Sequence, residues 1–131
     1  MNLILDTHIA IWFITGSNQL SESVKKLIEN PGNYCFISIA TLWEIGIKHS
    51  LGKLKLKAEL KKIFELFFDS GLILLPITPN HILTNASLPF YHRDPFDRLI
   101  IAQAKSEAYT VISQDREFEK YNINLIWDVK R

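Results

Sequence analysis

Short apolar runs alternate along the chain with longer segments in which apolar residues recur at helical spacing. The runs are short and most lack the alternation of apolar and polar residues that marks a sheet with one solvent-exposed face. Strands covered on both faces have this character, and parallel sheets are covered on both faces. Five runs therefore predict strands, at residues 3–5, 34–38, 72–76, 110–113 and 124–127.

Helical patterns separate the predicted strands. One is the apolar stretch at 40–47, and another is a helix that Asp94 and Pro95 begin. Three more show helical spacing: Val24, Leu27 and Ile28 after a capping Ser21; Leu60, Ile63, Phe64 and Phe67 before Gly71; and Ile82, Leu83 and Ala86 after Thr78-Pro79. Strand–helix alternation predicts an α/β layered sheet with right-handed crossovers. The 131 residues fit one domain, 1–131, and contain no repeat, linker or low-complexity segment.

Composition adds limits on cellular context. A hydrophobic content of 47% with 22% charged residues is ordinary for a globular protein. The single cysteine, Cys35, lies in an apolar run and is expected to act as a small buried hydrophobe. We find no targeting segment and no apolar run of membrane-spanning length, which predicts a cytoplasmic protein without a membrane partner. The net charge of +1 does not by itself indicate nucleic-acid binding.

Four acidic residues occupy the boundaries or interiors of these segments. Asp6 closes the first apolar run, Glu44 interrupts the apolar helical stretch, Asp97 opens a later helix and Asp115 follows the fourth run. Strand ends of an open α/β sheet converge on one crevice, where ligands bind. Carboxylate oxygens gathered there predict a site for magnesium or manganese.

Each acid also has a purely structural explanation. Glu44 stands four residues before Lys48, at ion-pair spacing on a helix. Asp6 and Asp115 can cap the segments that follow them, and Asp97 fits the first turn of its helix. Clustering favours the metal site, because a pair of carboxylates about 4 Å apart costs roughly 4 kcal/mol at an effective dielectric near 20. Either the acids are dispersed, or protons or a divalent cation hold them together.

Other chemistries find little support in the sequence. The four histidines show no metal-ligand spacing, and the nucleophile elbow, P-loop and dinucleotide fingerprint are missing. A phospho-acceptor receiver domain would carry adjacent acids after its first strand, whereas Asp6 is followed by Thr7. A catalytic serine, ATP and NAD are therefore poor candidates.

Four segments together resemble the PIN domain family, and more narrowly its VapC-type ribonuclease toxins. They are Asp6-Thr7 and residues 38–45, 92–104 and 113–118. The resemblance implies a three-layer α/β/α fold with a central parallel sheet of about five strands. It also implies a metal-dependent endoribonuclease in which Asp6, Glu44, Asp97 and Asp115 are the catalytic, metal-binding residues. One or two Mg²⁺ or Mn²⁺ ions are the implied cofactors, with Thr7, Ser38 and Asp94 as accessory residues.

The resemblance further implies an RNA substrate, a small cognate antitoxin protein and a homodimer. From charge and nearness in sequence, Lys48, Lys53, Arg93 and Arg98 are candidate phosphate contacts, although Arg98 fits a helix surface equally well. The broad apolar face at 60–68 is expected either to pack in the core or to meet a partner. The alternative function is a non-catalytic RNA-binding or protein-interaction module, which would be expected to have lost one or more acids.

Overall fold

The structure, a computed structural model, describes residues 1–128 and contains one parallel sheet. Its order is β3-β2-β1-β4-β5. The strands are β1 (Asn2–Leu5), β2 (Tyr34–Ser38), β3 (Ile73–Leu75), β4 (Thr110–Ser113) and β5 (Leu125–Trp127). All five predicted strands are confirmed. The two edge strands, β3 and β5, are shorter than predicted because each pairs with one neighbour over three residues.

Helices connect the strands. They are α1 (Thr7–Thr15), α2 (Glu22–Glu29), α3 (Ile39–Ser50), α4 (Leu60–Asp69), α5 (Pro79–Ser87), α6 (Pro95–Glu107) and the 3₁₀ helix η1 (Arg116–Tyr121). The predicted caps Ser21 and Asp94 accept backbone N–H groups of the first turns of α2 and α6, and Thr78, at the predicted start of α5, also acts as a cap. The helical periodicity of α1 is weak in the sequence, because the helix carries apolar residues on nearly all of its faces.

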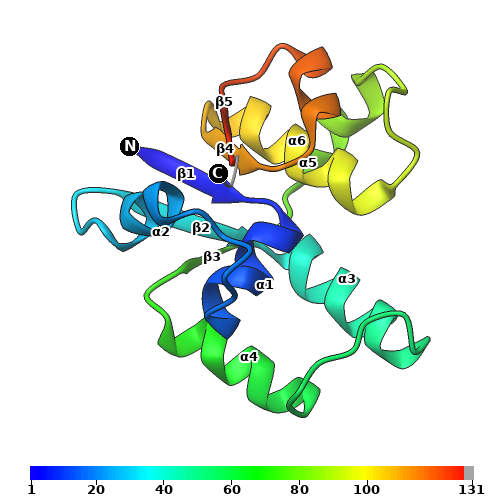
Figure 1. Cartoon of the computed structure of the whole chain (residues 1–131). Coiled ribbons are helices and arrows are strands. Elements are labelled where there is room, and N and C mark those ends of the chain that lie inside the picture. The colour runs from blue at the N-terminus through cyan, green and yellow to red at the C-terminus, as the bar shows by residue number, and fades with distance from the viewer. Residues whose placement is uncertain (129–131) are drawn as a thin grey trace.

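Helices cover both faces of the sheet, which gives the predicted three layers. Leu3 and Leu5 pack with α1, α2, α3 and α4, whereas Ile4 points to the opposite face and packs with α6 and η1. Figure 1 shows α5 and α6 together on one side of the sheet and α1 and α4 on the other. This alternation along β1 is what a strand buried on both faces requires.

The strand order reverses between β1 and β4 (Figure 1). From β1 the chain proceeds outward to β2 and β3, and it returns through α6 to pair β4 with the other edge of β1. The crevice beyond the carboxyl ends of two such strands is the usual ligand site of an open α/β sheet. Asp6 follows β1 and Asp115 follows β4, so the topology brings these two acids to that crevice.

Two further expectations are met by the described residues. Cys35 is buried, with its thiol directed at the carbonyl oxygen of Ile28. Helix α4 packs in the core through Phe67, which is fully buried, whereas Phe68 is 61% exposed. None of the helices within residues 1–128 is long and apolar enough to cross a membrane.

Candidate metal and active site

A pocket of about 220 Å³ opens at the carboxyl edge of the sheet. All four acids singled out in the sequence line this pocket, although they belong to four segments far apart in the chain. Its lining residues are Asp6, His8, Glu44, Lys48, Asp94, Asp97, Gln114, Asp115 and Phe118. We call it the acidic pocket.

Asp6 combines the structural and the site roles considered for it. As the N-cap of α1, its Oδ1 accepts the backbone N–H of Ile9 at 2.9 Å. Its Oδ2 accepts the hydroxyl of Ser113 from the end of β4, which ties the first turn to the fourth strand. Burial raises the pKa of Asp6, and these two hydrogen bonds and His8 oppose that rise. The two hydrogen bonds therefore fix the orientation of the carboxylate, but they do not fully offset the cost of burying its charge.

Glu44 points inward from α3 and is only 2% exposed. Its Oε1 accepts the hydroxyl of Thr7 at 2.7 Å, and that hydroxyl lies 3.2 Å from the hydroxyl of Thr41. Its Oε2 pairs with Nζ of Lys48, so the predicted i,i+4 ion pair exists. This pair borders the pocket, so Glu44 is a buried site carboxylate with one cation already beside it.

Asp97 is a second acid of the pocket whose pKa is raised. Burial raises the pKa of Asp97 to about 7, with Asp94, Glu44 and Asp6 adding to the rise and His92 opposing it. The face of α6 that it heads continues with buried Ile100. A carboxyl surrounded by other carboxylates gains most from a nearby cation, which would lower its pKa again.

Asp94 acts as a helix cap at the rim of the acidic pocket. Its Oδ1 accepts the backbone N–H groups of Phe96 at 2.8 Å and Asp97 at 3.2 Å. Ser38 is likewise a cap, since its hydroxyl accepts the backbone N–H of Ala40 at the start of α3. Both residues therefore position the helices that carry Asp97 and Glu44.

His92 is the site residue that the sequence analysis missed. Its Nε2 lies 2.9 Å from Oδ2 of Asp115, and its Nδ1 lies 3.1 Å from the hydroxyl of Tyr121. One ligand atom from each of His92, Asp97 and Asp115 falls within 4.8 Å of the others. No spacing rule could reveal this group, because its members converge only when α6 and η1 pack against each other.

The predicted phosphate-contacting residues differ in their surroundings. Lys48 lines the acidic pocket, and Arg93 is exposed just before α6. Lys53 is exposed beyond the end of α3 and does not line that pocket.

The prediction that Arg98 contacts a phosphate or lies on the helix surface is wrong. Arg98 is only 6% exposed, and its guanidinium donates to the carbonyl oxygens of Pro89, Asn85 and Leu88. It therefore holds the segment that follows α5 instead of meeting a phosphate or lying on the helix surface.

Similarity to known proteins provides evidence that is independent of the geometry of the site. A family model described as PIN domain matches residues 3–124. The chain belongs to the PIN domain family. The comparison with curated proteins finds no match.

Solved structures resemble this PIN domain over nearly its whole length. A chain of VapBC2 from Rickettsia felis, bound to a promoter DNA fragment, is 18% identical, with a TM-score of 0.76 and coverage of 98% of this chain and 100% of that one. DNA-bound VapBC from Salmonella typhimurium is 22% identical, with a TM-score of 0.68 and coverage of 96% and 97%. VapBC-5 from Mycobacterium tuberculosis is 20% identical, with a TM-score of 0.65 and coverage of 96% and 98%.

The donor set of this PIN domain fits a hard divalent cation. Carboxylate oxygens from Asp97 and Asp115 dominate the close cluster, with one histidine nitrogen beside them. Asp6, which follows β1, and Glu44, on α3, line the same pocket. Oxygen-rich sites of this kind suit magnesium and manganese. Burial and the neighbouring carboxylates raise the pKa of Asp97, and a bound cation would oppose that rise.

Proposed function

We propose that this PIN domain is a metal-dependent endoribonuclease that hydrolyses RNA phosphodiester bonds. The observation that carries the proposal is the convergence of Asp6, Glu44, Asp97 and Asp115 on one pocket, where Asp97 has a pKa of about 7. Membership of the PIN domain family supports nuclease chemistry as the general activity. A non-catalytic module would have no need to hold four carboxylates against their mutual repulsion.

One or two Mg²⁺ or Mn²⁺ ions are the proposed cofactors, held by the four acids. When bound, such an ion supplies charge neutralisation at the scissile phosphate and activation of the attacking water. The chain's own residues prepare the site for it. Thr7 fixes the rotamer of Glu44, Ser113 fixes that of Asp6, and Asp94 caps the helix turn that presents Asp97.

The RNA backbone needs cationic partners near the acids. Lys48 is the proposed phosphate contact inside the acidic pocket, where its pairing with Glu44 also keeps it charged. Arg93, just before α6, and Lys53, beyond the end of α3, are exposed cations. We assign them to RNA phosphates that lie further from the cleaved bond.

The proposal is tested with purified protein and labelled RNAs, both single-stranded and hairpin, in Mg²⁺ or Mn²⁺. Cleavage should disappear in EDTA and in Asp97→Asn, which removes the charge and keeps the shape. The matched control is Asp69→Asn at the exposed end of α4, which should cut like the parent. Cutting that survives EDTA or Asp97→Asn would contradict the proposal. RNA binding without any cutting would favour the interaction module.

We further propose that the protein is the toxin of a toxin–antitoxin pair and forms a homodimer. Support for the antitoxin partner comes from the similar solved structures, which are described as VapBC and, for VapBC-5, as a member of a family of toxin-antitoxin systems. The homodimer is proposed from the resemblance to VapC-type toxins alone. A groove of about 520 Å³ between α3 and α4, lined by apolar side chains that include Trp43, Phe64 and Phe68, is the proposed antitoxin surface.

Phe68→Glu tests this partner assignment, because it adds a charge to an exposed apolar position. The variant should lose co-purification with a co-expressed antitoxin and keep its RNA cleavage and its dimeric mass by light scattering. A variant that becomes monomeric while still binding the antitoxin would make the groove the dimer interface instead.

A further inference from the structure

The acidic pocket contains a cation that belongs to the chain itself, the ammonium group of Lys48. Its Nζ pairs with Oε2 of Glu44 one helical turn earlier on α3, and both side chains line the pocket. Burial distinguishes this pair from an ordinary surface ion pair, because the side chain of Glu44 is 3% exposed and that of Lys48 is 36% exposed. Two charges that are partly withdrawn from water attract each other more strongly than two exposed charges.

Other acids of the pocket also act on Lys48. Burial lowers the pKa of Lys48, but the hydrogen bond and the charge of Glu44 outweigh that effect, and the charges of Asp94 and Asp97 add to the resulting rise. Three carboxylates therefore stabilise one ammonium group, which stays charged. Lys48 thus lies where the pocket attracts positive charge.

The two oxygens of Glu44 differ in their partners. Oε1 accepts the hydroxyl of Thr7 at 2.7 Å, and a neutral donor of this kind orients a carboxylate without opposing a metal ion on its other oxygen. Oε2 accepts Nζ of Lys48 instead. This oxygen is the one that a divalent cation would take, so the ammonium competes with the cation for it.

We propose that Lys48 is a built-in counter-ion of the acidic pocket, which holds Oε2 of Glu44 until a divalent cation binds and then releases it. This inference rests on the proposed metal site. An ammonium group and a divalent cation on one carboxylate oxygen repel each other, and the repulsion is strong where water is partly excluded. Lysine suits such an exchange because its ammonium is a point charge on a flexible stem of four carbons.

Release would leave the ammonium group tethered beside the acids. The side chain of Lys48 already reaches solvent over about a third of its surface, so it has room to leave Glu44 without a change of the helix. The released group can then donate to a phosphate oxygen, which is the role proposed above for Lys48. Metal binding and the grip on RNA would therefore be coupled through one side chain.

A purely structural ion pair leads to the opposite expectation. If Lys48 served to orient Glu44, its removal would loosen a metal ligand and weaken metal binding. Removal of a competitor instead frees Oε2 and strengthens metal binding. The direction of the change in affinity therefore separates the two roles.

The first test titrates Mn²⁺ into the parent, Lys48→Met and Lys62→Met proteins by isothermal titration calorimetry. Lys48→Met should bind at least about fivefold more tightly, because apparent affinity falls with the fraction of the site that is available. Lys62→Met is the matched control, since Lys62 forms an exposed i,i+3 pair with Glu65 on α4, and it should bind like the parent. Equal or weaker binding by Lys48→Met, with its fold verified by circular dichroism, would overturn the inference.

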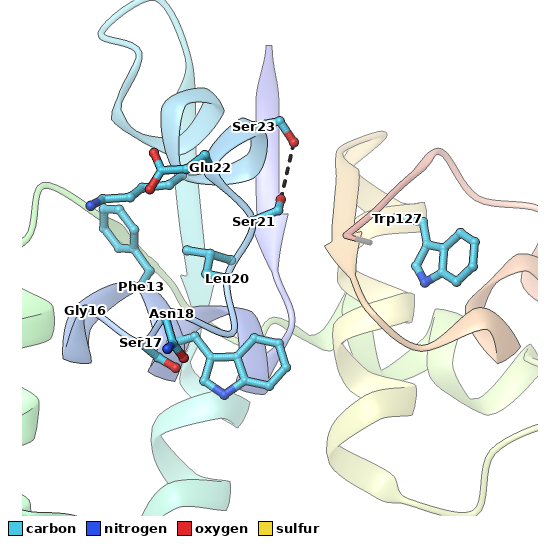
Figure 2. Close-up of a pocket in the computed structure, with 11 residues that line it drawn as sticks. Phe13, Gly16, Ser17, Asn18, Leu20, Ser21, Glu22, Ser23 and Trp127 are labelled. Atoms are coloured by element: carbon cyan, nitrogen blue, oxygen red, sulfur yellow. Dashed lines mark hydrogen bonds between the residues drawn. The ribbon is translucent and has the colours of Figure 1, made fainter. Parts of the chain in front are cut away.

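The second test follows the ammonium group itself by chemical labelling. The parent protein is acetylated with an amine-reactive ester in EDTA and in saturating Mg²⁺, and mass spectrometry quantifies each modified lysine. Labelling of Lys48 should be slow in EDTA and several-fold faster in Mg²⁺. Lys25 is the control, because it lines, with Trp12 and Trp127, a separate hollow of about 860 Å³ between α1 and α2 (Figure 2). Its labelling should be the same in both conditions.

The two tests together distinguish the possible failures. Tighter Mn²⁺ binding by Lys48→Met with unchanged labelling of Lys48 would mean that the lysine acts through its charge alone, and it would overturn the exchange. Negative results in both tests, from a parent that binds Mn²⁺ and cuts RNA, would overturn the inference and leave the proposed nuclease intact. A parent that binds neither Mn²⁺ nor Mg²⁺ would overturn the metal site and the inference together.

Discussion

Nε2 of His92 lies 2.9 Å from Oδ2 of Asp115. Tyr121 holds this imidazole from the other side, with its hydroxyl near Nδ1 and accepting the backbone N–H of His92 at 2.6 Å. The ring also meets Phe118 edge to face. Contacts with Asp115, Phe118 and Tyr121 therefore hold His92, in the loop before α6, against η1 and its cap, and the histidine in turn fixes the orientation of a site carboxylate.

Removing His92 should loosen Asp115 and weaken metal binding. Loss of a residue that orients a metal ligand typically costs about 10–100-fold in affinity. We expect His92→Ala to bind Mn²⁺ at least about tenfold more weakly by isothermal titration calorimetry. His49→Ala, which removes an exposed histidine near the end of α3, should leave the affinity unchanged. Equal affinities in all three proteins would show that Asp115 needs no support from His92.

Asp97 predicts a pH-dependent stability of the metal-free protein. Its pKa of about 7 in the folded chain exceeds the ordinary value of 3.8, so between these values the folded state binds more protons than the unfolded state. The contribution of this group to the free energy of unfolding therefore falls as pH rises from about 4 to about 7. Above pH 7 the charged carboxylate destabilises the folded chain.

Asp97→Asn should accordingly be more stable than the parent at pH 8, by on the order of 2 kcal/mol after solvent screening is allowed for. The difference should shrink as pH falls and should be smallest well below pH 4, where the parent carboxyl is protonated in both states. Urea unfolding in EDTA at several pH values checks this expectation. A constant difference across the pH range would place its origin outside the titration of Asp97.

Thr7 donates its hydroxyl to Oε1 of Glu44, and that proton cannot serve a second acceptor. Thr41 must then donate to Thr7 across their 3.2 Å contact. We expect Thr7→Val to reduce stability by about 1–3 kcal/mol, because a buried carboxylate loses a donor, and to weaken Mn²⁺ binding. Thr41→Val should cost less than about 1 kcal/mol and keep the metal affinity. Urea unfolding and calorimetry of the two variants compare the two hydroxyls directly, and equal effects would contradict this assignment of donors.

Arg98 should matter for stability and only indirectly for RNA. Its guanidinium donates hydrogen bonds to three carbonyl oxygens, and its Cζ lies 4.2 Å from the centroid of the Phe90 ring. We expect Arg98→Ala to lower the free energy of unfolding by about 3 kcal/mol, and Arg98→Lys to recover little, because one ammonium cannot reproduce the planar fork. The exposed neighbour Arg93 provides the control, since Arg93→Ala should change stability by less than about 0.5 kcal/mol. A small effect of Arg98→Ala in urea unfolding would contradict the anchoring role.

The five strands, helices α2 to α6 and the four pocket acids follow from the sequence alone, because they depend on local patterns. Buried parallel strands require continuous apolar runs, and caps require particular residues at the turn after a strand or before a helix. Glu44 and Asp97 are visible for the same reason, as carboxylates on otherwise apolar helical faces.

Tertiary structure alone decided which side chains meet. The sequence of Arg98 reads equally well as a surface cation, and only the packing of α6 against the end of α5 buries it on three carbonyl oxygens. His92 has no partner within hydrogen-bonding reach along its own segment, and it joins Asp115 and Tyr121 only across the packed elements. Trp12 and Trp127 likewise line one cavity although 115 positions separate them. Such contacts depend on how helices and strands are placed in space, and the periodicity of a single segment carries no information about that placement.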